Sequence, residues 1–213
     1  MTNSVRVILL SVAGLVAALA HSQGTGSVID LASRRELMVD RFLIDRLEGT
    51  SLRLQTPRPG GVALTYDRPW EDRFSFYTTV LKDGGKYLMY YRVYFGGVID
   101  KGDGTCYAES TDGIHWTRPS LGLVEFAGSR HNNLIEPPGK QFTAFIDTRP
   151  GVPAAERFKG NCEGGGGLQG WVSGDGIHWK KVQEAPIIMR SLANNFDSQN
   201  VMFWSEAERC YVL

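Results

Sequence analysis

A seven-residue motif that occurs twice constrains the fold of this chain more than any other feature of its sequence. STDGIHW at residues 110–116 recurs as SGDGIHW at 173–179, with six of the seven positions identical and an offset of 63 residues. Each copy follows a short run of alternating character, and Asp-Gly between two such runs is a strong signal for a β-hairpin. The repeat therefore predicts two equivalent antiparallel units.

The repeated unit has the strand content expected of a propeller blade. In the first unit, alternation and turn residues predict strands at 76–81, 86–94, 105–111 and 114–118. Four antiparallel strands in each repeat are typical of a β-propeller. Blade one is expected to span about 74–118, blade two about 132–182, and blade three to begin at about 197. We therefore expect an all-β fold, an incomplete N-terminal portion of a propeller with about two and a half blades.

The first twenty residues read as an export signal. Arg6 precedes an uncharged run of 14 residues, 7–20, which ends in the Ala-Leu-Ala pattern that a signal peptidase recognises. This run is too short for a transmembrane helix, which needs about 20 apolar residues. We expect residues 1–20 to be a signal peptide and 21–35 a linker, so that the mature protein is secreted or periplasmic and has no membrane attachment after cleavage.

Composition excludes several classes of partner. The chain has 23 Lys and Arg against 23 Asp and Glu, so its formal net charge is zero. A nucleic-acid-binding protein usually carries a basic excess or a basic stripe, and a protein held on a membrane surface carries a polybasic segment. We therefore expect neither nucleic acid nor membrane as a partner. The content of 42% hydrophobic and 11% aromatic residues is sufficient for a packed core.

The cysteines and the remaining motifs give no sign of a metal or cofactor. Cys106, Cys162 and Cys210 form no C-x-x-C pair, which excludes a zinc knuckle and a thioredoxin-type motif. One disulfide could form after export, but we favour three buried free thiols because each cysteine lies in an apolar strand-like run. The glycine-rich segment 164–167 lacks the Lys-Ser/Thr of a phosphate loop. We expect no cofactor and no metal.

Several segments together resemble a known family. They are the two S-x-D-G-x-x-W hairpins, LMVDRFLID at 37–45, DRPWE at 67–71, MYYR at 89–92 and DSQN at 197–200. Over residues 36–213 the chain resembles the five-bladed β-propeller glycoside hydrolase superfamily, which contains invertase-like and arabinanase-like enzymes, and in particular its exported bacterial members. The resemblance implies hydrolysis of a carbohydrate substrate. The segments 36–45 and 52–56 would then be strands that precede blade one.

The resemblance also indicates where catalytic carboxylates would lie. Glycosidases use two carboxyl groups that face each other across the sugar, and in the resembled family these acids stand where the innermost strand of each blade enters the central funnel. Mapped onto this chain, that position corresponds to Glu71 and Asp72 in blade one and to Asp197 in blade three. Blade two has Asn132 and Asn133 where the family pattern has an acid, which puts the complete catalytic set in question.

Other polar and aromatic residues near these positions are candidates for substrate binding. Trp70 stands beside the two acids of blade one, and its ring suits the face of a pyranose. Arg92 either neutralises a carboxylate of the funnel or faces solvent. Gln199 shares a strand face with Asp197 at the period of two. The candidate binding residues are Trp70, Arg92, Asn132, Asn133, Gln199 and Asn200.

The repeated acids have a structural interpretation instead. Asp112 and Asp175 occupy the same position of the two motifs, so we expect each carboxylate to accept backbone N–H groups within its own turn. His115 and His178 repeat in the same way and are expected to serve the fold. Asp147 follows a strand at its far end and is expected to lie away from the funnel.

Three functions stay open from the sequence. The first is an exported glycoside hydrolase of the five-bladed propeller type. The second is a non-catalytic propeller that binds a glycan or a protein, which the missing acid of blade two favours. The third is a sialidase-like enzyme, because the hairpin motif is similar to the sialidase Asp-box S-x-D-x-G-x-x-W, although it is one residue shorter between Asp and Gly.

Overall fold

The computed structural model describes residues 28–213 except 73, 96–101, 138–139, 192–195 and 197. The proposed signal peptide therefore lies outside the described residues. The chain divides into two units, residues 1–57 and residues 58–213. None of the described residues of the first unit, 28–57, is in a strand or a helix.

The leading strands predicted at 36–45 and 52–56 are therefore wrong. The backbone of the first of these segments makes local turns, such as the hydrogen bond from the Val39 N–H to the Leu37 carbonyl at 2.9 Å. The side chain of Phe42 is 81% exposed. A strand requires a neighbouring strand to pair its N–H and C=O groups, and alternating character in the sequence does not supply that neighbour.

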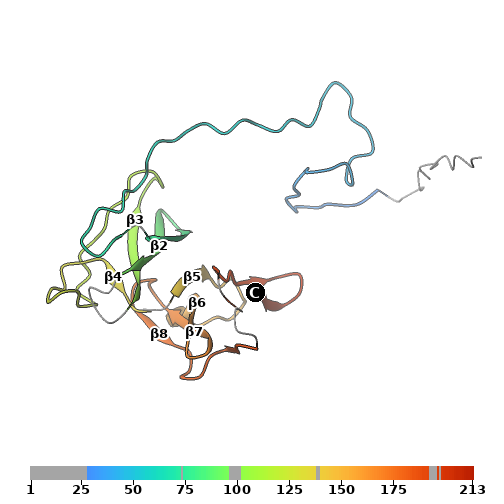
Figure 1. Ribbon diagram of the computed structural model, residues 1–213. Coiled ribbons are helices and arrows are strands. Elements are labelled where there is room, and N and C mark those ends of the chain that lie inside the picture. Colours follow the sequence, from blue (N-terminus) through green and yellow to red (C-terminus); the bar gives the residue numbers. More distant parts are fainter. Residues whose placement is uncertain (1–27, 73, 96–101, 138–139, 192–195, 197) are drawn as a thin grey trace, which may run out of the picture. The chain divides into compact units, whose positions relative to one another are not determined.

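The second unit begins with a four-stranded antiparallel sheet in the order β1-β2-β3-β4 (Figure 1). Its strands are β1 (Phe76–Asp83), β2 (Lys86–Tyr94), β3 (Asp103–Ser110) and β4 (Leu134–Ile135). The first three agree with the sequence prediction within a few residues, because the turn at 83–86 and the alternating pattern fix them locally.

The fourth strand predicted for this sheet, 114–118, is wrong. In that segment Thr117 makes an isolated bridge to Glu109, while β4 takes the outer position by pairing with Thr105 and Cys106. The turn itself is not the cause, because Gly113 and Gly176 have nearly the same φ, +76° and +79°, and the second turn is followed by β8. The outer strand is instead β4, which begins 16 residues after the end of the predicted segment.

A second antiparallel sheet repeats the arrangement, as the motif repeat predicts. It consists of β5 (Lys140–Ile146), β6 (Phe158–Gly164), β7 (Gly167–Ser173) and β8 (Trp179–Lys181), with β9 (Ile188–Met189) paired to the start of β7. A 3-10 turn, η1 (Ala154–Glu156), precedes β6. Among the described residues no α-helix occurs, so the all-β class is confirmed.

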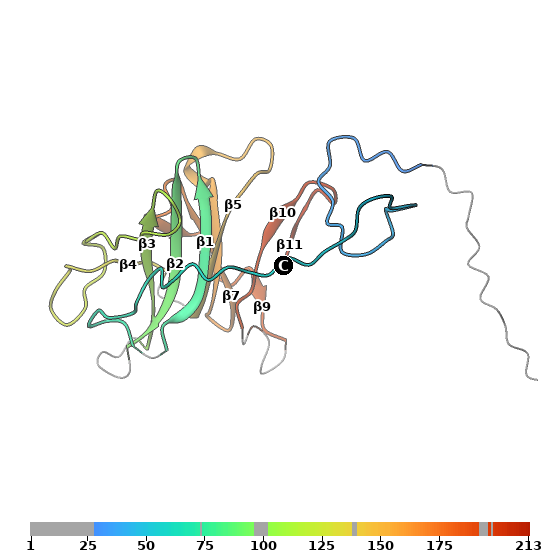
Figure 2. The ribbon, with the colours of Figure 1, turned by 90° about the horizontal axis from the view of Figure 1, so that it is seen from above.

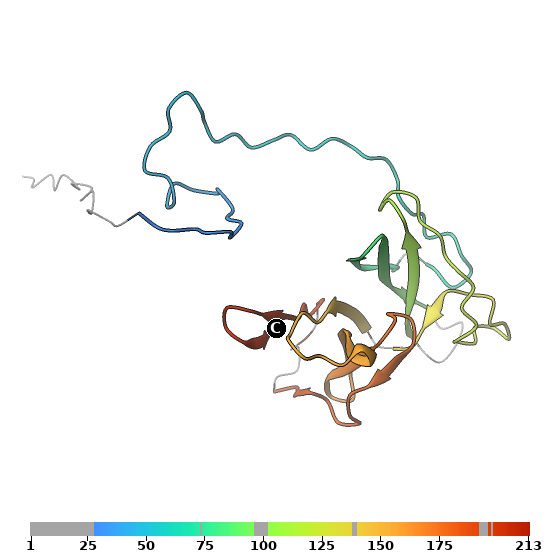
Figure 3. The same cartoon turned by 180° about the vertical axis from the view of Figure 1, so that it is seen from behind.

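A two-stranded hairpin follows, formed by β10 (Phe203–Ser205) and β11 (Cys210–Val212). It lies beside the second sheet, as seen from behind in Figure 3, and Tyr211 of β11 contacts Phe145 of β5 with ring centroids 6.3 Å apart. The Tyr211 hydroxyl also donates a hydrogen bond to Asp147 at 2.7 Å, directly after the end of β5. Asp147 is thus a buried anchor for the hairpin at the far end of its strand.

Two hydrophobic clusters form the core of the second unit. One joins the two sheets, since β1 and β5 lie next to each other (Figure 2) and the cluster draws on both sheets through Tyr90, Tyr107, Phe142, Phe158 and Trp179. The other covers the opposite face of the first sheet, where Tyr91, Val93 and Cys106 pack against residues of the preceding and following loops. The two middle strands of the first sheet, β2 and β3, are therefore largely buried on both faces, whereas the edge strand β1 is partly exposed.

In the described part of the chain no helix is long and apolar enough to span a membrane. Cys106, Cys162 and Cys210 are not joined by a disulfide. Cys106 and Cys162 are buried as expected, but Cys210 is exposed; it begins β11 of the two-stranded hairpin, whose strand residues are exposed or half-buried.

Candidate functional site

The two Asp-Gly hairpins contain the same set of hydrogen bonds. One carboxylate oxygen of Asp112 accepts from the backbone N–H groups two and three residues later, both at 2.8 Å, and Asp175 does the same at the same distances. The other oxygen lies 2.6 Å from Nδ1 of His115 in the first hairpin and 2.7 Å from Nδ1 of His178 in the second. The predicted structural role of these four residues is confirmed.

The same contacts keep both aspartates ionised. Burial alone would raise the pKa of Asp175, but hydrogen bonds from the side chain and the backbone of His178 lower it to about 2. The side chain and the backbone of His115 likewise hold the pKa of Asp112 well below its usual range. A general acid needs a proton near neutral pH, so neither aspartate suits that role.

Glu71, the first of the two acids predicted before β1, lies in a buried polar network. The Glu71 side chain has no exposed surface and lies 2.7 Å from Nη1 of Arg118. Its other oxygen accepts a hydrogen bond from the Tyr91 hydroxyl at 2.5 Å, and burial raises the pKa of Tyr91 well above its usual range. The backbone N–H groups of residues 67 and 68 also donate to Glu71. This carboxylate therefore ties a loop to the first sheet.

The same network gathers two of the predicted binding residues. Trp70 Nε1 donates to the side-chain oxygen of Asn133 at 2.8 Å, and the Asn133 amide donates to Tyr91 and to the Tyr107 carbonyl. Asn132 bonds instead to the backbone of Val124 and Leu134. A cleft of about 240 Å³ lies beside this network; its lining residues include Trp70, Arg118, Ser120, His131, Asn132 and Asn133.

Asp72, the second acid before β1, has a different environment. It is partly exposed, and its Oδ1 accepts a hydrogen bond from the Phe74 N–H at 2.7 Å. Beyond it, the rings of Phe74 and Phe76 are 42% and 36% exposed. The start of β1 thus carries a partly exposed carboxylate followed by aromatic side chains at the surface.

Arg92 of β2 stands opposite the first residue of β1 in the sheet register. Its guanidinium pairs with Asp103 of β3 and lies over the rings of Phe76 and Tyr94, at 5.1 and 6.0 Å from their centroids. The Arg92 side chain is 14% exposed, so it does not simply face solvent, and its partner Asp103 is not one of the acids predicted for the funnel. Its partner Asp103 was missed by the sequence reasoning, because the two residues are joined only by the pairing of β2 with β3.

The beginning of the third repeat reaches both sheets. Gln199 donates a hydrogen bond to the Thr79 hydroxyl of β1 at 2.8 Å. The Asn200 carbonyl accepts one from the Asn161 side chain of β6 at 2.9 Å. Asp197, two residues before Gln199 in the sequence, lies outside the described residues. Gln199 therefore contacts the first strand of the first sheet, whereas Trp70 bonds to Asn133.

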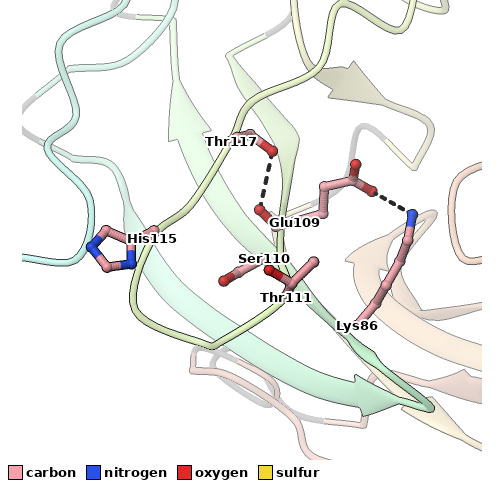
Figure 4. Close-up of a pocket in the computed structure, with 6 residues that line it drawn as sticks. All are labelled: Lys86, Glu109, Ser110, Thr111, His115 and Thr117. Atoms are coloured by element: carbon pink, nitrogen blue, oxygen red, sulfur yellow. Dashed lines mark hydrogen bonds and ion pairs between the residues drawn. The ribbon is translucent and has the colours of Figure 1, made fainter.

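A second cleft, of about 250 Å³, lies between the first hairpin and the sheet (Figure 4). Glu109 is its central acid; it is 3.5 Å from the Lys86 ammonium and accepts a hydrogen bond from the Tyr107 hydroxyl. The His115 ring points away from both charged groups (Figure 4). The cleft contains none of the predicted site residues. Within the described ranges no cluster of three or more His, Cys, Asp or Glu could hold a metal ion.

Comparisons with known proteins give little beyond this geometry. No family model matches the chain, and no curated protein matches it. A solved structure titled "Glycoside hydrolase" shares 18% sequence identity with it, over 62% of this chain, at a TM-score of 0.36. The chain spans 44% of the length of that structure. The function must therefore be argued from the residues themselves.

Proposed function

We propose that this chain belongs to an exported carbohydrate-active enzyme of the five-bladed propeller type, which hydrolyses a glycoside at the N-terminal ends of its first strands. The observation that carries the proposal is the group of partly exposed side chains at the start of β1. Asp72, Phe74 and Phe76 follow one another there, next to the ion pair of Arg92. Aromatic surface with a few convergent polar groups is typical of small-molecule sites.

The arrangement of the repeats supports a propeller. First strands of successive blades surround a common axis in that fold, and here β1 and β5 contact each other. The hydrogen bonds of Gln199 to β1 and of Asn200 to β6 bring the start of the third repeat to the same region. Three successive repeats thus contribute to one place in the molecule.

Asp197 and Asp72 are the catalytic carboxylates that we propose. Asp72 is partly exposed, whereas the Glu71 carboxylate is occupied by Arg118, Tyr91 and backbone N–H groups; catalysis by Glu71 stays a prediction. A separation of about 5 Å between the two carboxyl groups would indicate a retaining mechanism, and about 6.5–9.5 Å an inverting one.

Hydrolysis assays with the full chain test this proposal. The panel consists of sucrose, fructo-oligosaccharides, arabinan and xylo-oligosaccharides, with release of reducing sugar as the readout. Asp197→Asn and Asp72→Asn should each abolish hydrolysis of whichever member is cleaved and leave the melting temperature unchanged. Glu125→Gln, at an exposed loop position, is the matched control and should retain full activity. Full activity in Asp197→Asn would remove Asp197 from the mechanism.

A glycan-binding protein without catalysis is the second candidate. Two observations favour it: the Glu71 carboxylate is used by the fold, and the side chains of Asn132 and Asn133 are buried and bonded to protein groups. Binding of a panel member by calorimetry, with no product released, would select this alternative.

A sialidase-like enzyme finds less support. It would need arginines that can bind the carboxylate of the sugar. Arg149, Arg157 and Arg190 each pair with an acidic residue of the protein, namely Asp147, Asp83 and Glu163 respectively. Sialyllactose, added to the panel, should not be cleaved.

A further inference from the structure

The first strand of the first sheet contains a β-bulge close to its N-terminal end. Phe76 pairs with Arg92, but the next pair in the register is Thr79 with Tyr90. Tyr77 and Thr78 therefore stand opposite the single residue between these partners. Tyr77 adopts a left-handed backbone conformation with φ of +53°, which L-residues other than glycine rarely occupy.

The second sheet has the same bulge at the equivalent place. Lys140 pairs with Glu163, and the next pair is Thr143 with Asn161. The residue after Lys140 is Gln141, whose φ is +58°, and it stands 64 residues after Tyr77. In bulges of this type the left-handed position is normally a glycine. Both repeats therefore place a side chain where glycine would be less strained.

The bulge changes where Tyr77 points. Successive side chains of a regular strand project to opposite faces of the sheet. Here the rings of Phe76 and Tyr77, neighbours in the sequence, lie with their centroids 4.5 Å apart and their planes inclined by 54°. Phe76 is 36% exposed and Tyr77 is partly exposed, and neither ring belongs to the two core clusters. Core packing therefore does not explain why the strained residue is an aromatic one.

We propose that the bulge aims Tyr77 beside Phe76 so that the two rings form a binding platform for a sugar ring of the substrate. Strained backbone is concentrated at binding and catalytic sites, where surrounding structure holds it in place, and bulges recur next to active sites because they re-aim a side chain. The Arg92 guanidinium stacks on the Phe76 ring, 5.1 Å from its centroid, and so holds that ring in place. This platform rests on the proposed function, since it assigns the subsite for the same carbohydrate.

The test separates the ring of Tyr77 from the strain of its backbone. Tyr77→Gly removes both, Tyr77→Phe keeps the ring, and Phe76→Ala removes the neighbouring ring without changing a left-handed position. Ala127→Gly is the matched control for strain, because Ala127 is an exposed residue with φ of +48° outside the strands. Affinity is measured by calorimetry with arabinan, xylo-oligosaccharides and fructo-oligosaccharides, and stability by thermal unfolding.

We expect Tyr77→Gly and Phe76→Ala each to weaken binding about tenfold, the size of an aromatic contact, with no fall in melting temperature for Tyr77→Gly. Tyr77→Phe should bind within about twofold of the wild type, and Ala127→Gly should bind as the wild type does. If Tyr77→Gly does not fold, the binding of Phe76→Ala decides the question.

Two results would overturn the platform for different reasons. Unchanged affinity in Phe76→Ala and Tyr77→Gly, with a wild type that binds, would refute the platform and leave the proposed function standing. Failure of the wild type to bind any of the three saccharides, together with no hydrolysis of any member of the panel including sucrose, would refute the proposed function, and the platform with it.

Discussion

Replacing Arg118 with methionine should destabilise the second unit strongly, because it leaves the Glu71 carboxylate charged and buried without its cation. The Glu71 side chain has no exposed surface, the Arg118 side chain is 11% exposed, and the two groups are 2.7 Å apart. Removal of one partner from a buried ion pair costs about 3–5 kcal/mol. The total stability of a domain is about 5–15 kcal/mol, so this loss should be visible as a large shift in a urea unfolding curve followed by tryptophan fluorescence.

Arg68→Met is the matched control for the loss of an arginine. Arg68 is 51% exposed and 3.7 Å from Asp67, and an exposed pair of this kind contributes at most about 1 kcal/mol. The double variant Arg118→Met with Glu71→Gln should recover much of the loss, since the buried charge is gone. If Arg118→Met unfolds within about 1 kcal/mol of the wild type, the Glu71 carboxylate is hydrated, and it returns to the set of acids available for catalysis.

Three further predictions follow from the hairpins and the N-terminus. Asp175→Ala removes two backbone hydrogen bonds and should cost about 2 kcal/mol in thermal unfolding; Asp112→Ala should cost less, because its hairpin is more exposed. The pKa of Asp175 is lowered to about 2, so its contribution to the free energy of unfolding is complete above about pH 4 and is lost as the pH falls to about 2. When the free energy of unfolding is measured against pH, Asp175→Asn should lack this loss between about pH 4 and pH 2. N-terminal sequencing of the exported protein should begin near His21, and an intact Met1 in that fraction would contradict the signal peptide.

The hairpins were predictable because their chemistry is local. Asp112 and Asp175 bond to N–H groups two and three residues away, so a seven-residue motif determines the turn. What the motif does not determine is burial. Trp179 of the second copy packs against Tyr90 and Phe142, at 5.9 and 4.9 Å between ring centroids, whereas Trp116 of the first copy is only half-buried, against the other core cluster.

The wrong strand predictions have one physical cause. The alternating pattern of a strand occurs in residues 36–45, 52–56 and 114–118. Alternation shows which side chains would share one face of a strand, but it does not show which other strand would pair with it. In the first sheet the outer position went to β4, which pairs with Thr105 and Cys106. Pairing over such distances in the sequence depends on how the intervening loop packs, and a single sequence does not reveal it.

The two neighbouring acids before β1 show most clearly where sequence reasoning ends. Glu71 accepts the N–H groups of residues 67 and 68, which is a local contact that the turn at Pro69 makes readable from the sequence. Its ion-pair partner Arg118 lies 47 residues further along the chain, and no local pattern in the sequence predicts that contact. That pair occupies the Glu71 carboxylate, whereas the adjacent Asp72, whose Oδ1 accepts from the Phe74 N–H, is partly exposed; this difference in exposure is the reason that we propose Asp72 as a catalytic acid. Two adjacent acids thus differ, since Glu71 is buried and holds the loop while Asp72 is partly exposed, and only the three-dimensional contacts distinguish them.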